Sequence, residues 1–271
     1  MRLVPPFPYF GGKMRIAEQI IAQFPEHDRY CEPFAGSLAV LLAKPPESVE
    51  IVNDLDSRLV NFWRTLRERG DELWEACSYT PHSREEYDRA KKGPAPEDPI
   101  ENARQLWILY TQSVSAAYEQ AGWRPPGSTR KSTGAHLSRF SERFAGIAQR
   151  LHHVSLENLP AEKIIRRHMD DEGMLFYVDP PYLAETRVNE KDYVHDMSSE
   201  AEHRALLELL VQVRGPVVLS GYPSDLYDSI LTGWTVLQIG AQTQNGGERT
   251  EVLYINRTPP TVLFGSGLWE E

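Results

Sequence analysis

The stretch "FYVDPPYL", residues 176–183, places an acid, two prolines and a tyrosine directly after residues typical of a buried strand. Proline lacks a backbone donor and has a fixed φ, so the strand must end at about Asp179. The turn that follows holds Asp179 and Tyr182 close together at a strand end, where open α/β sheets bind ligands. The Asp179 carboxylate and a proline carbonyl are both acceptors, and together they can take the two hydrogens of an exocyclic amine.

This arrangement predicts chemistry on the amine of a nucleobase. An amino nitrogen conjugated to a purine is a poor nucleophile. Two acceptors that hold its hydrogens favour a tetrahedral nitrogen whose lone pair can attack, and the Tyr182 ring can stack on the base. Taken alone, the four residues "DPPY" fit an ordinary proline turn with a capping acid equally well. The other motifs of the chain must therefore distinguish a site for a nucleobase amine from an ordinary turn.

Two further stretches have the form of a cofactor site. In "CEPFAGS", residues 31–37, a strand, a turn with Gly36 and a helix start present backbone N–H groups and a bare backbone. The three-glycine dinucleotide fingerprint is incomplete, because Leu38 stands where a third small residue is expected. Asp54 ends the next strand at a spacing from which an acid can reach a ribose hydroxyl. Asp56 is better placed to cap the following helix.

A third stretch, "YFGGK" at residues 9–13, is not a triphosphate-binding loop. It lacks the first glycine at the required distance, and Met14 stands where a Ser or Thr must follow the lysine. Lys13 is expected near a helix start, where the helix dipole disfavours a cation, so it needs an anion. The carboxylate of a cofactor is one candidate.

The bulk composition leaves a phosphate-bearing partner open. A net charge of -10 argues against nucleic acid, yet six basic residues accompany one acid between Trp123 and His153. Solvated surface charges are the alternative reading of that cluster. Cys31 and Cys77 are in no metal-ligand spacing, so packed thiols and no metal are expected. No apolar run approaches the roughly 18 residues of a membrane helix, and a cytoplasmic location is expected.

The apolar patterning predicts an α/β protein with a helical insertion. Helix, strand, helix and strand alternate up to about residue 69, and β-branched apolar runs that suit central strands return after residue 151. Residues 71–150 contain helical segments, a proline-rich connection and an irregular loop, but no convincing strand. We expect one domain from residues 1–68 and 151–271 and a mainly helical subdomain at 69–150. The predicted strands are "RYCE", "VEIVNDLD", "HHVSLEN", "GMLFYVD", "GPVVLSGY", "GWTVLQIG" and "EVLYIN".

Taken in order, "YFGGK", "CEPFAGS", "VNDLD", a basic helical insert, "FYVDPPY" and "RTEVLYIN" strongly resemble the Dam-type DNA adenine methyltransferases. The ordered combination is specific although each piece is common. The resemblance implies an enzyme that uses S-adenosylmethionine to methylate a flipped-out adenine at a defined site in double-stranded DNA. It also implies a Rossmann-like, seven-stranded, mostly parallel sheet, with a target-recognition subdomain between the cofactor motifs and the DPPY motif.

The resemblance further implies roles for the residues that match. It assigns catalysis to Asp179, Pro180 and Tyr182. It assigns the cofactor to Tyr9, Lys13, Glu32, Phe34, Gly36, Asp54 and Asp179. In the insert, DNA contacts are expected from Trp123, Arg124, Arg130, Lys131 and Arg139. No metal, no covalent intermediate, no membrane contact and a monomeric state are expected.

The chain departs from the Dam pattern in three places. Tyr9 stands where tryptophan is usual, residues 122–134 lack the Phe-Asn-Val-Pro recognition stretch, and "LPAEKII" at 159–165 replaces an acid followed by an aromatic. The target sequence and the contact to the cofactor's adenine therefore stay open. So does a restriction-modification, regulatory or phage setting. The alternatives are a methyltransferase acting on the cytosine amine, one acting on adenine in RNA, and a DNA-binding protein that has lost catalysis.

Overall fold

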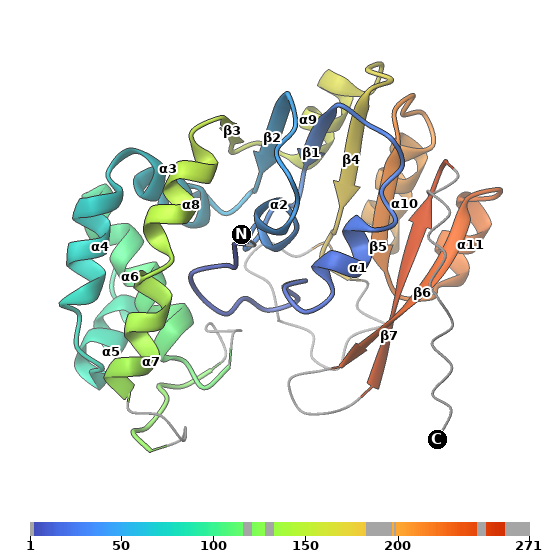
Figure 1. Ribbon diagram of the computed structural model, residues 1–271. Coiled ribbons are helices and arrows are strands. Elements are labelled where there is room, and N and C mark those ends of the chain that lie inside the picture. Colours follow the sequence, from blue (N-terminus) through green and yellow to red (C-terminus); the bar gives the residue numbers. More distant parts are fainter. Residues whose placement is uncertain are drawn as a thin grey trace, which may run out of the picture.

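The computed structural model describes residues 3–115, 121–127, 133–182, 197, 199–242 and 248–257. Its centre is one seven-stranded sheet with the order β3-β2-β1-β4-β5-β7-β6 (Figure 1). The first five strands of that order pair in parallel, and β7 runs antiparallel to β5 and β6. This confirms the predicted mostly parallel α/β sheet. The strands are β1 (Arg29–Glu32), β2 (Val49–Asn53), β3 (Val154–Glu157), β4 (Met174–Val178), β5 (Val217–Gly221), β6 (Thr235–Gln242) and β7 (Glu248–Ile255).

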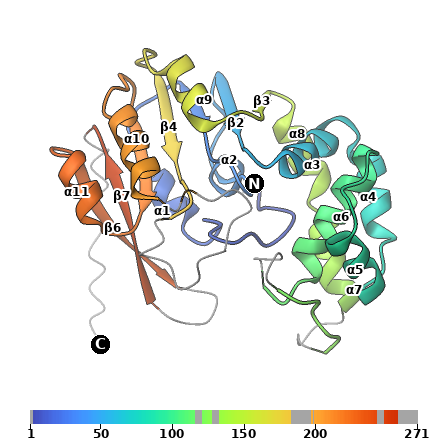
Figure 2. The ribbon, with the colours of Figure 1, turned by 180° about the vertical axis from the view of Figure 1, so that it is seen from behind.

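Helices cover both faces of the sheet, as the nearly continuous apolar strands require. Along β4, Leu175 and Tyr177 belong to the core shared with α1 (Ala17–Ile21) and α2 (Ala39–Ala43). Phe176 and Val178 belong to the core on the opposite face. That face is covered by three helices, which lie in front when the molecule is seen from behind (Figure 2). They are α9 (Ala161–His168), α10 (Glu200–Leu210) and α11 (Asp225–Ile230).

A group of helices lies beside the sheet, between β2 and β3 in sequence (Figure 1). It is joined to the sheet by α3 (Ser57–Glu68), which packs against α6 (Pro99–Gln112). Helix α6 is central to the group, because its residues from Gln105 to Gln112 are all buried. Within the described part of residues 70–151 the only strand-like pairing is an isolated bridge between Ser113 and Trp123. The other helices of the group are α4 (Gly70–Ser78), α5 (Arg84–Lys92), α7 (Thr133–Ser141) and α8 (Phe144–Leu151).

Two expected helix starts are corrected by the structure. The helix predicted from about Ser37 begins at Ala39, because Leu38 has a left-handed φ of 56° and so cannot continue a right-handed helix. Lys13 precedes α1, which begins at Ala17, so the helix dipole does not act on it directly. The two cysteines, Cys31 and Cys77, are buried free thiols as predicted.

Candidate active site

A cavity of about 240 Å³ opens at the carboxyl ends of β1, β2 and β4. The order of the strands reverses between β1 and β4, and this is where open α/β sheets bind ligands. The fold brings together all seven residues predicted to contact a cofactor, although they come from four separate segments. The cavity lining includes residues 9–13, 32–37, 53–56 and 160–162, with Tyr177, Asp179, Pro181, Met197 and Glu202.

The turn after β1 is fixed by contacts that only glycine permits. Gly36 has a φ of +48°, and a Cβ atom there would lie 2.9 Å from Cε1 of Tyr9, so the tyrosine ring lies directly against the turn. The Gly36 amide donates to Oδ2 of Asp54 at 2.8 Å, and its carbonyl accepts from Nε1 of Trp63 at 3.1 Å. Leu38, two residues after Gly36, is buried and has a left-handed backbone conformation, which stores local strain. A rigid turn with a bare backbone therefore forms one wall of the cavity.

The two acids after β2 have separate roles. Asp56 is the N-cap of α3 and accepts from the backbone amides of Arg58 and Leu59, which confirms the predicted cap. Asp54 lines the cavity, where its carboxylate accepts from the amides of Gly36 and Asp56. Ribose binding by Asp54 stays a prediction that this geometry allows.

Glu32 is a buried acid in the cavity wall, with 2 % of its surface exposed. The hydroxyl of Tyr30 donates to its Oε1 at 2.5 Å. Burial raises the pKa of the Glu32 carboxyl to about 8, because a charge at this position loses its hydration. At neutral pH the side chain is therefore mostly protonated when the cavity holds no ligand.

The raised pKa of Glu32 predicts a pH-dependent stability. The stabilising effect of its proton is complete below the ordinary pKa of 4.5 and is lost as pH rises through about 8. Between those limits Glu32→Gln, which never ionises, should gain stability relative to the wild type by on the order of a few kcal/mol. Urea unfolding of both proteins at several pH values measures the difference. A difference that does not change with pH would show that folding does not raise the pKa of Glu32.

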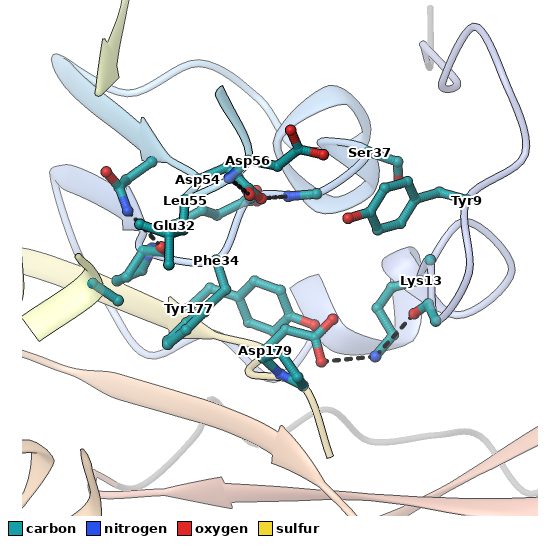
Figure 3. A pocket seen from close by; sticks show the side chains of 18 of the residues that line it. Tyr9, Lys13, Glu32, Phe34, Ser37, Asp54, Leu55, Asp56, Tyr177 and Asp179 are labelled. Carbon is teal, nitrogen blue, oxygen red and sulfur yellow. Dashed lines mark hydrogen bonds and ion pairs between the residues drawn. The ribbon is translucent and has the colours of Figure 1, made fainter. Parts of the chain in front are cut away.

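The acid of the DPPY stretch is held by two donors that are remote in sequence. Oδ1 of Asp179 accepts from Nζ of Lys13 at 2.8 Å and from Oγ of Ser220 at 2.7 Å. Figure 3 shows the Lys13 ammonium pointing at this carboxylate, while Asp54 lies at the other end of the cavity. None of the described residues donates a hydrogen bond to Oδ2 of Asp179. The anion that Lys13 requires is thus supplied by the protein itself.

Tyr182 is buried beside this pair. Its hydroxyl accepts from Lys13 at 2.5 Å and donates to Oε1 of Glu251 at 2.9 Å. Its ring centroid is 4.5 Å from that of Tyr222, with the planes inclined at 46°. The first proline, Pro180, is buried, and the second, Pro181, lines the cavity. The turn therefore holds the acid and the aromatic ring together, as the two prolines predicted.

Three residues that contact Asp179 or Tyr182 were not predicted from the sequence. Ser220 and Tyr222 lie in and directly after β5, and Glu251 lies in β7. The signal was present but weak: a serine inside the apolar run "VVLSGY" and an acid at the start of "EVLYIN". Buried polar side chains in apolar strands need partners, yet sequence alone does not say which.

The described members of the predicted DNA-contacting set, Trp123, Arg124 and Arg139, lie in the helical region and do not line the cavity. Trp123 stacks on His82 with centroids 4.7 Å apart, and the guanidinium of Arg84 lies 4.7 Å from the centre of its ring. Arg124 donates through Nε to the carbonyl of Ser113 at 2.9 Å. Both contacts tie residues 121–127 to neighbouring helices. A role in DNA binding stays a prediction for each residue.

The other basic residues of this region differ in availability. Arg139 is exposed in the last turn of α7, whereas Arg130 and Lys131 lie outside the described residues. Arg143 donates to the carbonyl of Pro5 at 2.5 Å, and Arg150 forms a buried ion pair with Glu50. Two members of the basic cluster therefore have partners within the protein and are only partly exposed.

Neither a metal centre nor a membrane span is found in the described part of the chain. Its histidine, cysteine, aspartate and glutamate side chains form no group of three or more that could ligate an ion. None of its helices combines the length and the apolar character that a bilayer crossing requires.

Two known proteins are similar in sequence to this chain. Over 277 residues the chain is 24% identical to the type II methyltransferase M1.LlaDCHI of Lactococcus lactis subsp. cremoris, which covers 91% of this chain and 93% of that protein. Over 67 residues it is 36% identical to the DNA N-6-adenine-methyltransferase of Escherichia phage P1, which is 25% of this chain and 9% of that protein.

Among solved structures, the rRNA methyltransferase aviRa from Streptomyces viridochromogenes is similar with a TM-score of 0.41 and 13% identity, over 93% of this chain and 88% of that one. Residues 9–245, which include the glycine turn, the helical region and the DPPY turn, match the family described as D12 class N6 adenine-specific DNA methyltransferase. The chain accordingly belongs to the D12 class of N6 adenine-specific DNA methyltransferases.

Proposed function

We propose that this enzyme transfers the methyl group of S-adenosylmethionine to the exocyclic amino nitrogen of an adenine flipped out of double-stranded DNA. The observation that carries the proposal is the state of the Asp179 carboxylate. Lys13 and Ser220 occupy one of its oxygens, and the other is left to accept a hydrogen from a ligand in the cavity. An acceptor held in this way is suited to an amine and needs no rearrangement at the moment of reaction.

The chemistry of the cavity fits S-adenosylmethionine. Asp54 can accept from ribose hydroxyls, and the Gly36 turn lets a ligand approach the backbone. Glu32 and Asp179 suit the cationic groups of the ligand. Leu55 and the segment that begins at Pro160 offer apolar walls for an adenine ring, in place of the acid and aromatic that the chain lacks. When bound, S-adenosylmethionine supplies an electrophilic methyl group on its sulfonium.

The protein's part in the reaction is to hold the amine. Oδ2 of Asp179 and the Pro180 carbonyl accept its two hydrogens, which favours a tetrahedral nitrogen with a directed lone pair. Asp179 can then take the proton that the nitrogen loses. The Tyr182 ring supports the base by stacking. Because Tyr222 lies against that ring, the base must either displace Tyr222 or use the opposite face.

Extraction of the base from the duplex costs about a few kcal/mol of unstacking, which contacts to DNA must offset. We assign those contacts to a target-recognition subdomain at residues 69–150, and catalysis to the domain formed by residues 1–68 and 151–271. Within the subdomain, Arg124, Arg130, Lys131 and Arg139 would hold phosphates, and Trp123 would fill the gap or touch a base. One chain carries both parts, so a monomer in the cytoplasm suffices for the activity.

Arg139→Ala and Lys131→Ala should each weaken binding to duplex DNA and flatten its salt dependence. Each phosphate contact that is lost should reduce the slope of log K against log salt by about 0.9, because fewer counterions are released. Fluorescence anisotropy across a salt series measures both quantities. Arg204→Ala is a matched control, since Arg204 is an exposed arginine of α10 paired with Glu200. Unchanged slopes in the first two variants would place the DNA elsewhere.

The proposal as a whole is tested by expression in cells that lack adenine methylation, followed by mapping of modified bases across the genome. N6-methyladenine at one recurring sequence is the expected result, and that sequence identifies the target. Methylation of the cytosine amine, or of RNA in place of DNA, would overturn the proposal in favour of one of the two enzymatic alternatives. No modification at all would favour a DNA-binding protein without catalysis.

A further inference from the structure

Glu251 is a buried acid at the point where strand β7 changes from polar to apolar residues. Its exposed fraction is 5 %, and the next four residues along β7, Val252 to Ile255, are buried and apolar or aromatic. A carboxylate removed from water in this way is strongly disfavoured unless it is paired and hydrogen-bonded. Burial accordingly raises the pKa of Glu251, while Lys13 acts in the opposite direction. The contacts that keep such a group in place therefore indicate what it does.

Those contacts lead to the two residues that flank Asp179. Oε1 of Glu251 accepts from the Tyr182 hydroxyl at 2.9 Å and lies 3.5 Å from Nζ of Lys13. Nζ of Lys13 in turn lies 2.5 Å from the Tyr182 hydroxyl and 2.8 Å from Oδ1 of Asp179. The four side chains form a connected network in which Lys13, Tyr182 and Glu251 are buried and Asp179 is partly exposed. It joins the N-terminal loop, the DPPY turn and the antiparallel strand β7.

We propose that Glu251 is a positioning residue for methyl transfer: it holds the Tyr182 hydroxyl and the Lys13 ammonium so that the Tyr182 ring and the Asp179 carboxylate keep one orientation. The tyrosine ring can turn about its side-chain bonds, and stacking fixes only its plane. A hydroxyl that accepts from Lys13 and donates to Glu251 fixes the ring's direction as well. Glu251 itself does not line the cavity, so it acts on the target base only through these partners.

This inference rests on the proposed function, because it concerns the orientation of the groups that would receive the adenine. Its consequence is a loss in the rate of transfer without a matching loss in binding. Displacement of a positioned group by about 1 Å can reduce a rate by about 10²-fold, even where the changed residue is outside the reaction centre. A residue that only stabilises the fold would not produce this pattern.

The test is single-turnover methyl transfer to a duplex that carries the mapped target site. Glu251→Ala should lower the rate by about 10- to 100-fold. The affinities for S-adenosylmethionine, measured by calorimetry, and for the duplex, measured by anisotropy, should change little. Glu251→Gln keeps an acceptor oxygen and should recover most of the lost rate. Tyr254→Phe is the control on the same strand, because it removes a buried hydroxyl that bonds Asp228 and leaves the network intact.

Tyr182→Phe keeps the ring and removes only the hydroxyl, so it tests the same contact without change at Glu251. This variant should also slow methyl transfer. When Glu251→Ala is added to Tyr182→Phe, it should lower the rate of transfer by a markedly smaller factor than it does in the wild type. The inference is overturned by a wild-type rate in Glu251→Ala or in Tyr182→Phe. It is also overturned if the rate losses of Glu251→Ala and Tyr182→Phe are fully additive in the double variant, or if Tyr254→Phe lowers the rate as much as Glu251→Ala does. A wild-type protein that methylates no adenine would instead contradict the proposed function.

Discussion

Asp179→Ala should abolish detectable methyl transfer, with a loss of about 10²–10³-fold or more in the single-turnover rate. The reason is geometric. Asp179 supplies the acceptor that draws the amine hydrogens out of conjugation with the ring, and no other described carboxylate shares its place after β4. The variant should fold, since Lys13 keeps Glu251 as a partner. It should also bind S-adenosylmethionine measurably, because Gly36, Asp54 and Glu32 are unchanged.

Asp179→Asn sharpens this test because it preserves shape. The amide would direct its oxygen to the two donors, Lys13 and Ser220, and would turn its NH₂ group toward the target amine. A donor would then face a donor, so the asparagine variant should be nearly as inactive as the alanine variant. Calorimetric titration with S-adenosylmethionine and thermal unfolding serve as controls for cofactor binding and folding. Near-normal turnover in either variant would refute the role of Asp179.

Lys13→Met should destabilise the protein and abolish transfer together. Lys13 is 5 % exposed, and its ammonium lies within 3.5 Å of the Asp179 and Glu251 carboxylates. Removal of one partner from a buried ion pair leaves a charge without compensation and costs about 3–5 kcal/mol in the free energy of unfolding. The Asp179 carboxylate would also lose one of the two donors that orient it. Urea unfolding and single-turnover transfer measure the two effects.

Two further variants separate the charge effect from general loosening. Lys163→Met changes an exposed lysine on α9 and should leave stability and transfer near the wild-type values. The double variant with Lys13→Met and Glu251→Gln should regain part of the lost stability, because one buried carboxylate then remains without a cation where there had been two. An unfolding free energy of Lys13→Met within about 1 kcal/mol of the wild type would show that the ammonium does not compensate these acids.

The seven strands could be predicted because each is encoded by local pattern. A buried parallel strand must be apolar on both sides, and "MLFYV" and "VVLSG" show this directly. Helices α9 and α11 were not identified from the sequence. The start of α2 was misplaced because Leu38, directly before the helix, adopts a positive φ that the sequence does not reveal. The start of α1 was misplaced because residues 14–16 form a turn before the helix begins at Ala17.

The basic cluster illustrates the limit of counting charges along a sequence. Arg143 and Arg150 are indistinguishable from surface arginines in the sequence between Trp123 and His153. In the folded chain Arg150 pairs with Glu50, a residue of β2, and Arg143 donates to the backbone of the N-terminal segment. Their partners lie 100 and 138 residues away, so no local pattern could identify them.

The sequence by itself determined the parts of the site that depend on backbone stiffness and local order. Two prolines end β4 and place an acid and a ring in one turn, Gly36 permits a close backbone approach, and Asp56 caps α3 so that Asp54 stays in the cavity. Only the tertiary structure decided which groups hold Asp179 and Tyr182. Their partners Lys13, Ser220 and Glu251 come from segments 41 to 169 residues distant. Such contacts depend on the order of strands β4, β5 and β7 across the sheet, which burial of the whole core selects and no short stretch encodes.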